Sequence, residues 1–232
     1  TVNTLNNSWA KSNRLTLQAL VEYSKTFKNH YFHLLGGVSS QSYNYNDISA
    51  YRNRFTNNEI TQINAGATAQ ATNGGTAAAN KLASYFGRLN YNYQEKYLFE
   101  TNFRYDGSSR FPADNRWGFF PSASAAWRLS EEGFFKDIIS SVNNLKLRFS
   151  WGKLGNQSIG DYPYQSLLST GQNYAFGNEA AAGLAVTTIP NTRITWETTT
   201  ITDAGLDVGL FNNKLTFSFD YYKKLTSDIL YS

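Results

Sequence analysis

The 232-residue sequence contains no cysteine, and this absence excludes a disulfide framework, a thiolate nucleophile and any cysteine-ligated metal site. Methionine is also absent, and no charged segment followed by an apolar one opens the chain, so we expect an internal part of a longer protein. The longest stretch without a polar or charged residue, residues 180–186, is far shorter than the about 18 apolar residues of a membrane-spanning helix. Helical membrane spans are therefore excluded.

Charged residues are scarce, at 16% of the chain, and proline occurs only four times. Aromatic residues reach the same 16%, which is too many large rings for a disordered segment. The formal net charge is only +4, and the basic residues are scattered rather than gathered in a stripe, so we expect no nucleic-acid partner. The composition indicates a folded chain organised around amphipathic rings.

Strict two-residue alternation is the strongest pattern in the sequence. In residues 97–105 the odd positions hold Tyr, Phe, Thr, Phe and Tyr, and the even positions hold Leu, Glu, Asn and Arg. Such a strand has one aromatic face and one mostly polar face. Residues 85–93 repeat the pattern before a short polar turn and predict a hairpin. Comparable alternation, with Trp196 on the apolar parity of its segment, predicts about eight strands, at residues 15–23, 31–41, 85–93, 97–105, 117–129, 145–151, 195–210 and 215–221.

The connections between these strands alternate in length. Short links are predicted at residues 28–30, 94–96 and 211–214, and long ones at residues 42–81, 106–116 and 156–193. One further link, residues 130–144, contains Phe134, Phe135, Ile138 and Ile139 and predicts a single short helix. All short links then fall at one end of the strands and all long loops at the other, as in transmembrane β-barrels with periplasmic turns and extracellular loops. The pattern predicts an all-β fold, a segment of a transmembrane antiparallel β-barrel with its long loops outside the cell.

The aromatic residues favour the same interpretation over a soluble sandwich. The apolar parity holds Tyr, Phe, Trp and Ala rather than the Val, Ile and Leu of a shared core. Tyr91, Tyr93 and Tyr97 flank one short turn, and amphipathic rings near strand ends indicate an interfacial girdle. The alternative is a soluble all-β domain with aromatic cross-strand pairs.

Ordered blocks of sequence carry a more specific resemblance. The blocks are SYFGRLNYNY at residues 84–93, RYDGSSRF at 104–111, NRWGFFPSA at 115–123, LKLR at 145–148, WETT at 196–199, GLDVGLFNNKL at 205–215 and DYYKK at 220–224. Through them the chain closely resembles the SusC/RagA family of TonB-linked outer-membrane transporters. The resemblance covers most of the chain and is weakest in residues 1–81.

The resemblance implies a barrel of about 22 strands with an N-terminal plug. It also implies a bacterial outer-membrane location, contact with outer-membrane lipid, a SusD-like surface lipoprotein that lids the barrel, and TonB-driven import of glycans or peptides. No plug, TonB box or C-terminal aromatic strand is recognisable, so we expect residues 1–232 to form a partial barrel domain, served by the TonB system through the missing N-terminal region. Two other functions stay open: a structural or adhesive outer-membrane barrel, and a soluble all-β carbohydrate-binding domain.

No constellation of residues indicates catalysis, and we expect no enzyme activity, no cofactor and no metal site. His30 and His33 are the only histidines, and three residues apart on a strand they face opposite sides, so they cannot ligate one metal together. Asp203 and Asp207 share a parity but lie about 13 Å apart along a strand, too far for a general acid–base pair. Serines such as Ser108 lack a candidate histidine nearby, which argues against a serine hydrolase.

The motif at residues 106–111 is expected to be structural. Asp followed by Gly at a strand end favours an Asx-type turn that shapes an external loop, rather than a ligand contact. The resemblance implies a structural signature that consists of Arg104, Asp106, Gly107, Ser108, Arg110, Phe111, Trp117 and Gly118.

Charged residues on the polar parity of the strands are expected to face the lumen. Arg88, Arg104, Arg128 and Arg148 all lie on this parity. We expect these arginines to pair with lumen carboxylates such as Glu100, or with acids of a plug, rather than to bind substrate directly. The predicted lumen-facing charges are Arg88, Glu100, Arg128, Arg148, Glu197, Asp203 and Asp207.

Overall fold

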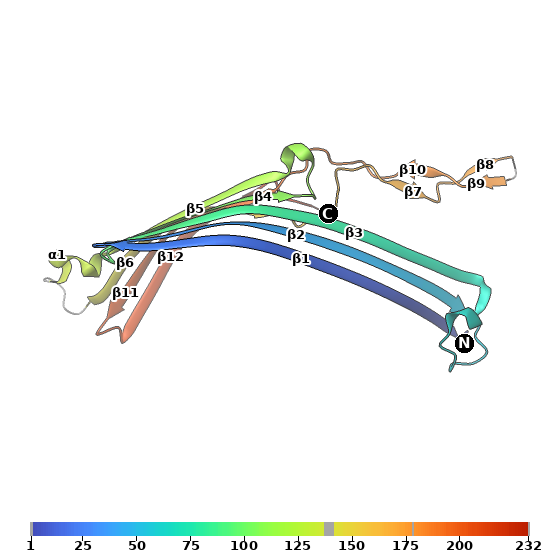
Figure 1. The fold of residues 1–232 in the computed structure, drawn as a ribbon, viewed down its shortest axis with the longest axis horizontal. Helices are drawn as coiled ribbons and strands as arrows, with labels where there is room; N and C mark the ends of the chain where they lie inside the picture. Colours follow the sequence, from blue (N-terminus) through green and yellow to red (C-terminus); the bar gives the residue numbers. More distant parts are fainter. Residues whose placement is uncertain (1, 137–141, 178, 232) are drawn as a thin grey trace. The chain divides into compact units, whose positions relative to one another are not determined.

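The computed structural model describes residues 2–136, 142–177 and 179–231. Within these residues, eight long strands form one antiparallel sheet in the order β1, β2, β3, β4, β5, β6, β11, β12 (Figure 1). Their bounds are β1 Thr4–Phe27, β2 His30–Asn53, β3 Ala67–Tyr93, β4 Tyr97–Ser108, β5 Trp117–Arg128, β6 Val142–Asn156, β11 Glu197–Leu210 and β12 Leu215–Ser227. The predicted all-β fold with about eight strands is confirmed, and the sheet is open because β1 and β12 form its two edges.

The chain divides into two compact units. Unit 1 comprises Thr1–Leu17 and Gln41–Lys81, and unit 2 comprises Gln18–Ser40 and Leu82–Ser232. In unit 1 a tip at residues 54–66 connects β2 to β3 and contains the short 3-10 helix η1 (Ile63–Ala65). Arg52 donates from Nη1 to the carbonyl oxygens of Asn64 (3.0 Å) and Gly66 (3.2 Å), and these hydrogen bonds hold the tip in place.

The predicted long loop at residues 42–81 is wrong, because β2 continues to Asn53 and β3 begins at Ala67. The first half of β3 consists mainly of Ala, Thr, Asn and Gly, so it lacks the apolar alternation that signals a strand. Polar cross-strand contacts hold it instead. Asp47 accepts hydrogen bonds from the backbone N–H of Thr76 (3.1 Å) and from its hydroxyl, and Asn53 donates to Gln70.

In unit 2 the strand register separates two faces. Phe99 of β4 pairs with Ala125 of β5, and Ala125 pairs with Phe149 of β6, on what we call the apolar face. Glu100 pairs with Ser124, and Ser124 with Ser150, on the opposite face, which we call the polar face. Because side chains alternate along each strand, the parity seen in the sequence continues unbroken from strand to strand.

Two ladders of stacked rings border the apolar face. In the turn-side ladder, the ring centroids of Tyr93 and Tyr97, and those of Tyr97 and Trp127, lie 6.2 Å apart. In the loop-side ladder, the Trp117 ring stacks on Tyr85 at 5.9 Å and on Tyr105 at 4.9 Å. From Tyr97 to Tyr105 strand β4 rises about 26 Å, or about 20 Å of height at a 40° tilt, which is comparable with the about 25 Å apolar band of a barrel wall.

The short links predicted at residues 28–30, 94–96 and 211–214 are confirmed, although His30 already belongs to β2. The link after β5 contains the 3-10 helix η3 (Leu129–Glu131) and the four-residue helix α1 (Gly133–Lys136), in agreement with the predicted short helix. Ile138 and Ile139 of that prediction lie outside the described residues. Among the residues that the structure describes, no helix has the length and apolarity needed to cross a membrane.

Glu132, in the link after β5, joins the members of the turn-side ladder. Its carboxylate accepts hydrogen bonds from the Tyr97 hydroxyl (2.7 Å), from Trp127 Nε1 (3.1 Å) and from Lys96 Nζ (3.2 Å). The hydrogen bonds from Tyr97 and Trp127, together with the charge of Lys96, hold the pKa of Glu132 below its usual range. No pattern in the sequence predicts a carboxylate in the girdle.

We expect Glu132→Gln to lower the thermal unfolding midpoint of the full-length protein in detergent near neutral pH, because three donors lose a charged acceptor. Because the pKa of Glu132 is lowered by folding, its stabilisation is complete above the unfolded pKa of about 4.3 and is lost as the pH falls through the lower folded value. The difference between wild type and variant should therefore close on acidification. Gel assays of heat-modifiable mobility at several pH values measure the unfolding midpoints of the wild type and the variant. Glu59→Gln, in the tip, is the control. A difference that persists unchanged in acid would contradict the assignment.

The link between β6 and β11 folds into two small ribbons, which we call the finger (Figure 1). Strand β7 (Leu168–Thr170) pairs with β10 (Leu184–Val186), and β8 (Tyr174–Phe176) pairs with β9 (Glu179–Ala181). By register, the large apolar side chains of each ribbon share one face, while Ser169, Ala175, Ala180 and Ala185 occupy the other. The large residues, all well exposed, are Leu168, Leu184 and Val186 in the first ribbon and Tyr174 and Phe176 in the second.

The buried core of unit 2 lies where the long links leave the sheet. It consists of Phe111, Phe120, Ile194 and Trp196. The expectation that Trp196 belongs to the apolar parity of its strand is wrong, because β11 begins only at Glu197. Trp196 is 6% exposed, and its ring centroid lies 5.0 Å from that of Phe111 and 5.2 Å from that of Phe120.

Candidate functional site

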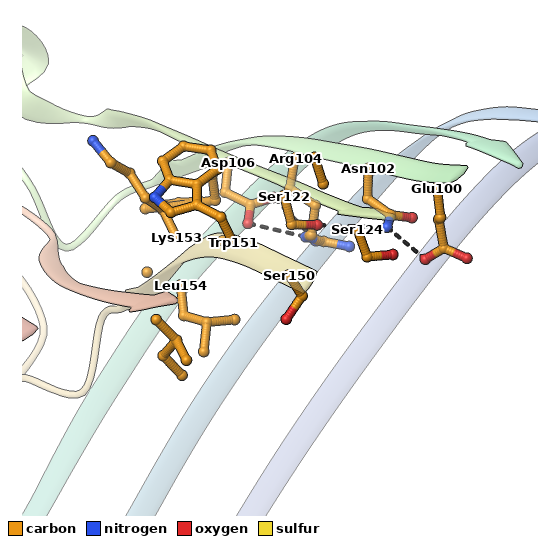
Figure 2. A pocket seen from close by; sticks show the side chains of 15 residues that line it. Glu100, Asn102, Arg104, Asp106, Ser122, Ser124, Ser150, Trp151, Lys153 and Leu154 are labelled. Atoms are coloured by element: carbon orange, nitrogen blue, oxygen red, sulfur yellow. Dashed lines mark hydrogen bonds and ion pairs between the residues drawn. The ribbon is translucent and has the colours of Figure 1, made fainter. Parts of the chain in front are cut away.

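The polar face carries a groove of about 610 Å³ that crosses β4, β5 and β6 (Figure 2). Charged, amide and hydroxyl side chains line one part of it: Glu100, Asn102, Arg104, Asp106, Ser122, Ser124 and Ser150. Apolar residues, among them Phe120, Leu154 and Ile201, line the rest. Pairing between β5 and β6 ends at Ser122 and Gly152, and the preceding residue, Pro121, has no N–H to donate to a neighbouring strand. The groove therefore forms where two strands separate.

A chain of hydrogen bonds links β3 to β4 at one end of this groove. Arg88 donates from Nε to Asn102 Oδ1 (2.6 Å), and Asn102 donates from Nδ2 to Glu100 Oε1 (2.8 Å). Figure 2 shows Asn102 and Glu100 side by side on β4. The amide thus bridges the arginine and the carboxylate, where the sequence predicted a direct ion pair with Glu100.

Arg104 and Asp106 form the next polar pair along β4. The guanidinium makes two hydrogen bonds to the carboxylate, from Nε (3.2 Å) and from Nη2 (3.0 Å), and Nη2 also donates to the Ser84 hydroxyl at 3.1 Å. Asp106 is 9% exposed and Ser84 is 2% exposed, while half of the Arg104 side chain remains accessible. A paired carboxylate at this depth fixes the guanidinium in one orientation.

A second arginine cluster joins β6, β11 and β12. Arg148 donates to Asp207 through Nε (2.8 Å) and Nη2 (3.0 Å), and its Nη2 reaches Asp220 at 2.8 Å. Gly205 lies directly between Arg148 and Asp220 in the register, and a Cβ atom there would approach Arg148 Cζ to 2.7 Å. Because Gly205 has no side chain, the Arg148 guanidinium can extend across β11 and reach Asp220.

The remaining predicted lumen charges are dispersed. Arg128 lies at the end of β5, where it contacts the carboxylates of Glu95 (3.5 Å) and Glu131 (3.4 Å) beside the short turns. Glu197, the first residue of β11, accepts hydrogen bonds from Asn156 Nδ2 (3.2 Å) and from the backbone N–H of Leu230 (3.0 Å). Asp203 lies on the polar face between Ser150 and Tyr222 in the register.

The signature at residues 104–118 ties the long links to the sheet, in a cluster that we call the loop-root knot. Arg110 donates from Nε to Asp161 (3.0 Å) and from Nη1 to the carbonyl oxygen of Gln157 (3.0 Å). The Ser108 hydroxyl accepts a hydrogen bond from the backbone N–H of Arg110 (3.2 Å). Phe111 is fully buried, and its ring packs against Trp196.

The predicted Asx-type turn at Asp106 and Gly107 is wrong, because β4 continues to Ser108. Gly107 pairs with Trp117 of β5, and a Cβ atom at Gly107 would lie 2.7 Å from the indole ring. The glycine therefore makes room for an aromatic ring rather than for a turn. Gly118 serves the same purpose for Phe120, whose ring would lie 2.4 Å from an added Cβ atom.

This arrangement presents charged, amide and hydroxyl groups on one face of the sheet. His30 bonds to the Tyr91 hydroxyl at 2.9 Å and lies beside the Tyr93 ring, and is thus part of the aromatic border. In the described ranges, no group of three or more His, Asp or Glu side chains is placed to hold a metal ion. The polar face offers fixed, largely paired charges and hydroxyl groups, which suits a wall along which a polar solute or another polar surface lies.

Sequence reasoning missed several partners of the predicted charges. Asp220, Asp161 and Ser84 contact Arg148, Arg110 and Arg104, respectively. Asp220 stands on the polar parity of β12, between Phe219 and Tyr221, so alternation could have placed it on the right face. Asp161 carries no such signal, because it lies in an irregular link whose position depends on the fold.

Comparison with known proteins gives consistent matches. A model of the family described as TonB dependent receptor-like, beta-barrel, matches residues 1–232. The TonB-dependent receptor P3 of Formosa agariphila is 38% identical over 211 residues, which cover 90% of this chain and 21% of that protein. The TonB-dependent receptor SusC of Bacteroides thetaiotaomicron is 44% identical over 163 residues, which cover 67% of this chain and 16% of that protein. The chain thus spans about a fifth of the length of these relatives.

The fold comparison agrees. A structure of the RagAB peptide transporter superimposes with a TM-score of 0.84 and 28% sequence identity, covering 98% of this chain and 25% of that chain. The RagAB peptide importer in its open-open state gives a TM-score of 0.82 with 27% identity, covering 96% of this chain and 24% of that chain. The open eight-stranded sheet therefore corresponds to one stretch of a much longer barrel chain.

Proposed function

The chain belongs to the TonB-dependent receptor β-barrel family, in its SusC/RagA branch, and we propose that it is part of a longer protein that imports glycans or peptides. The family comprises outer-membrane receptors and transporters and is not an enzyme family, and the chain is a component of the bacterial outer membrane. Residues 1–232 supply eight strands of a barrel of about 22. The edges β1 and β12 pair with strands outside this chain, which closes the barrel.

The observation that carries this proposal is the contrast between the two faces of unit 2. Phe99, Phe103, Phe149 and Phe219 are between 41% and 67% exposed, which only lipid or another apolar surface can cover. The opposite face holds Arg88, Arg104 and Arg148 in fixed hydrogen bonds. In a closed barrel this face becomes the lumen wall, where it meets water, the plug and the passing solute.

Two partners complete the proposed transporter. TonB acts through a segment outside this chain, and a SusD-like lipoprotein covers the barrel on the side of the long links. The finger supports the second partner, because a two-stranded ribbon is only marginally stable in water by itself. Residues 166–192 contain one charged residue, Glu179, so the finger suits an apolar protein surface better than a charged one.

Deletion of the full-length gene in its host should abolish uptake of a fluorescently labelled peptide pool or of a labelled oligosaccharide pool. The intact gene should restore uptake, and a version without its TonB-interacting segment should not, because import against a gradient needs energy that the barrel wall cannot supply. Surface immunoblotting confirms equal amounts of both versions. Unchanged uptake of both pools in the deletion strain would contradict the proposal and favour a structural or adhesive barrel.

A further inference from the structure

The apolar face of β4, β5, β6, β11 and β12 carries two charged side chains, Lys153 and Lys223, in strands whose residues are all described. Every other residue on that parity of these five strands is aromatic, aliphatic, glycine, proline or an uncharged polar residue. Figure 2 shows Lys153 and Trp151 on one side of the β6 ribbon, with Ser150 and Leu154 on the other. Charges of both signs occupy the polar face, whereas the apolar face holds cations alone.

The register places these two lysines close together. Lys153 of β6 pairs with Thr200 of β11, and Lys223 of β12 pairs with Thr202 of β11. With strands about 4.8 Å apart and about 3.4 Å of rise per residue, their Cα atoms are about 12 Å apart across β11. Both side chains are exposed, and each ends on a flexible four-carbon stem, so the two ammonium groups can reach one group above Thr200 and Thr202.

The height of the pair on the barrel wall matches the loop-side ladder. Lys223 is the eighth residue after Leu215, which opens β12, and Tyr105 is the eighth residue after Tyr97, which opens β4. Both strands start from the short turns, so Lys223 lies level with Tyr105. Lys153 pairs with Thr200, which is two residues nearer the long links than Thr202, the partner of Lys223. The lysines thus stand at the border between the apolar band and the headgroups.

The two lysines differ from their neighbours on the polar face. Lys146 Nζ lies 3.9 Å from Asp207 Oδ2. Lys224 lies on the polar face, opposite Ile201 in the register. On the apolar face of the five strands there is no Asp or Glu to neutralise Lys153 or Lys223. The position therefore suits an anion supplied by the surroundings.

We propose that Lys153, Thr200, Thr202 and Lys223 form a binding site for the phosphate of an outer-leaflet lipid. Two ammonium groups neutralise the phosphate, the two threonine hydroxyls can donate hydrogen bonds to its oxygens, and the neighbouring rings of Trp151 and Tyr221 pack against the acyl region. The site rests on the proposed orientation of the barrel, with the long links outside the cell, and is independent of which solute is imported.

Native mass spectrometry of the purified full-length protein in detergent tests the site. The probes are lipid A carrying its phosphates and the same lipid after enzymatic dephosphorylation. The double variant K153Q/K223Q should bind phosphorylated lipid A about thirtyfold more weakly than the wild type, since each lysine near an anionic headgroup strengthens binding about fivefold. K153R/K223R should restore binding, and K224Q, on the opposite face of the same strand, should bind like the wild type.

Each outcome decides the proposal. Equal binding by the wild type and K153Q/K223Q, or equal binding of both lipid forms to the wild type, would overturn it, as would an equal loss in K224Q. Displacement of the lipid by excess inorganic phosphate would assign the site to free phosphate rather than to a lipid, which also overturns it. Heat-modifiable mobility establishes that every variant is folded, and the K153R/K223R variant distinguishes lost charge from altered packing.

Discussion

Ala123→Arg is expected to prevent most of the full-length protein from assembling in the outer membrane. Ala123 lies on the apolar face of β5, between Thr101 and Trp151 in the register, and well inside the two aromatic ladders. An arginine on the lipid side near the midplane costs about 2–4 kcal/mol, because its charge leaves water without gaining a partner. The measured quantity is the heat-modifiable, folded fraction in isolated outer membranes.

The adjacent residue, Ser124, provides the matched control. It is a similarly small residue on the same strand, but it lies on the polar face directly opposite Glu100. An arginine there meets water and a carboxylate, so Ser124→Arg should assemble nearly as well as the wild type. Equal folded fractions for the two variants, or better assembly of Ala123→Arg, would show that the faces are assigned the wrong way round or that no bilayer surrounds β5.

Alternation predicted the strands of unit 2 well because a physical difference stands behind it. Residues 97–105 and 117–129 separate an apolar from a polar environment. A shift of the strand register by one residue would place Glu100 and Arg104 on the apolar face. The first half of β3 separates no such environments. Its Ala, Thr and Asn residues therefore look like a loop in the sequence, although backbone pairing and contacts such as Asp47 to Thr76 make it a strand.

The polar sites were only half predictable from the sequence. Parity placed Arg88, Arg104 and Arg148 on one face, but their partners depend on which strands are neighbours and on their register. Asp207 and Asp220 reach Arg148 from β11 and β12, across a 40-residue link that contains the finger. Glycine after aspartate signals a turn locally, whereas the role of Gly107, which is to leave space for Trp117, depends on the pairing of β4 with β5.

Phe111→Ala should open the loop-root knot while leaving the barrel folded. Phe111 is fully buried, and its ring packs on Trp196. Removal of such a side chain costs about 3–5 kcal/mol, from lost burial and from the cavity that remains. The loss falls on residues 108–116, 156–164 and 190–196, because the knot lies at the end of the sheet and the strand pairs of unit 2 do not depend on it. Hydrogen exchange should therefore quicken in these segments alone, by about a hundredfold or more where local opening limits exchange.

Amide exchange of the full-length protein in detergent, followed by mass spectrometry of peptic peptides, separates the knot from the strands. The amides of Phe111, bonded to the Ser108 carbonyl oxygen, and of Ile194, bonded to the Asn191 carbonyl oxygen, report on the knot, and the β4–β5 ladder reports on the barrel. Phe176→Ala is the matched control, because that ring is 70% exposed in the finger and its removal leaves no cavity in the core. Unchanged exchange of the knot peptides in Phe111→Ala would show that the long links are held by Arg110 and Asp161 rather than by the buried ring. Quickened exchange throughout β4 and β5 would instead show that the signature supports the barrel wall itself.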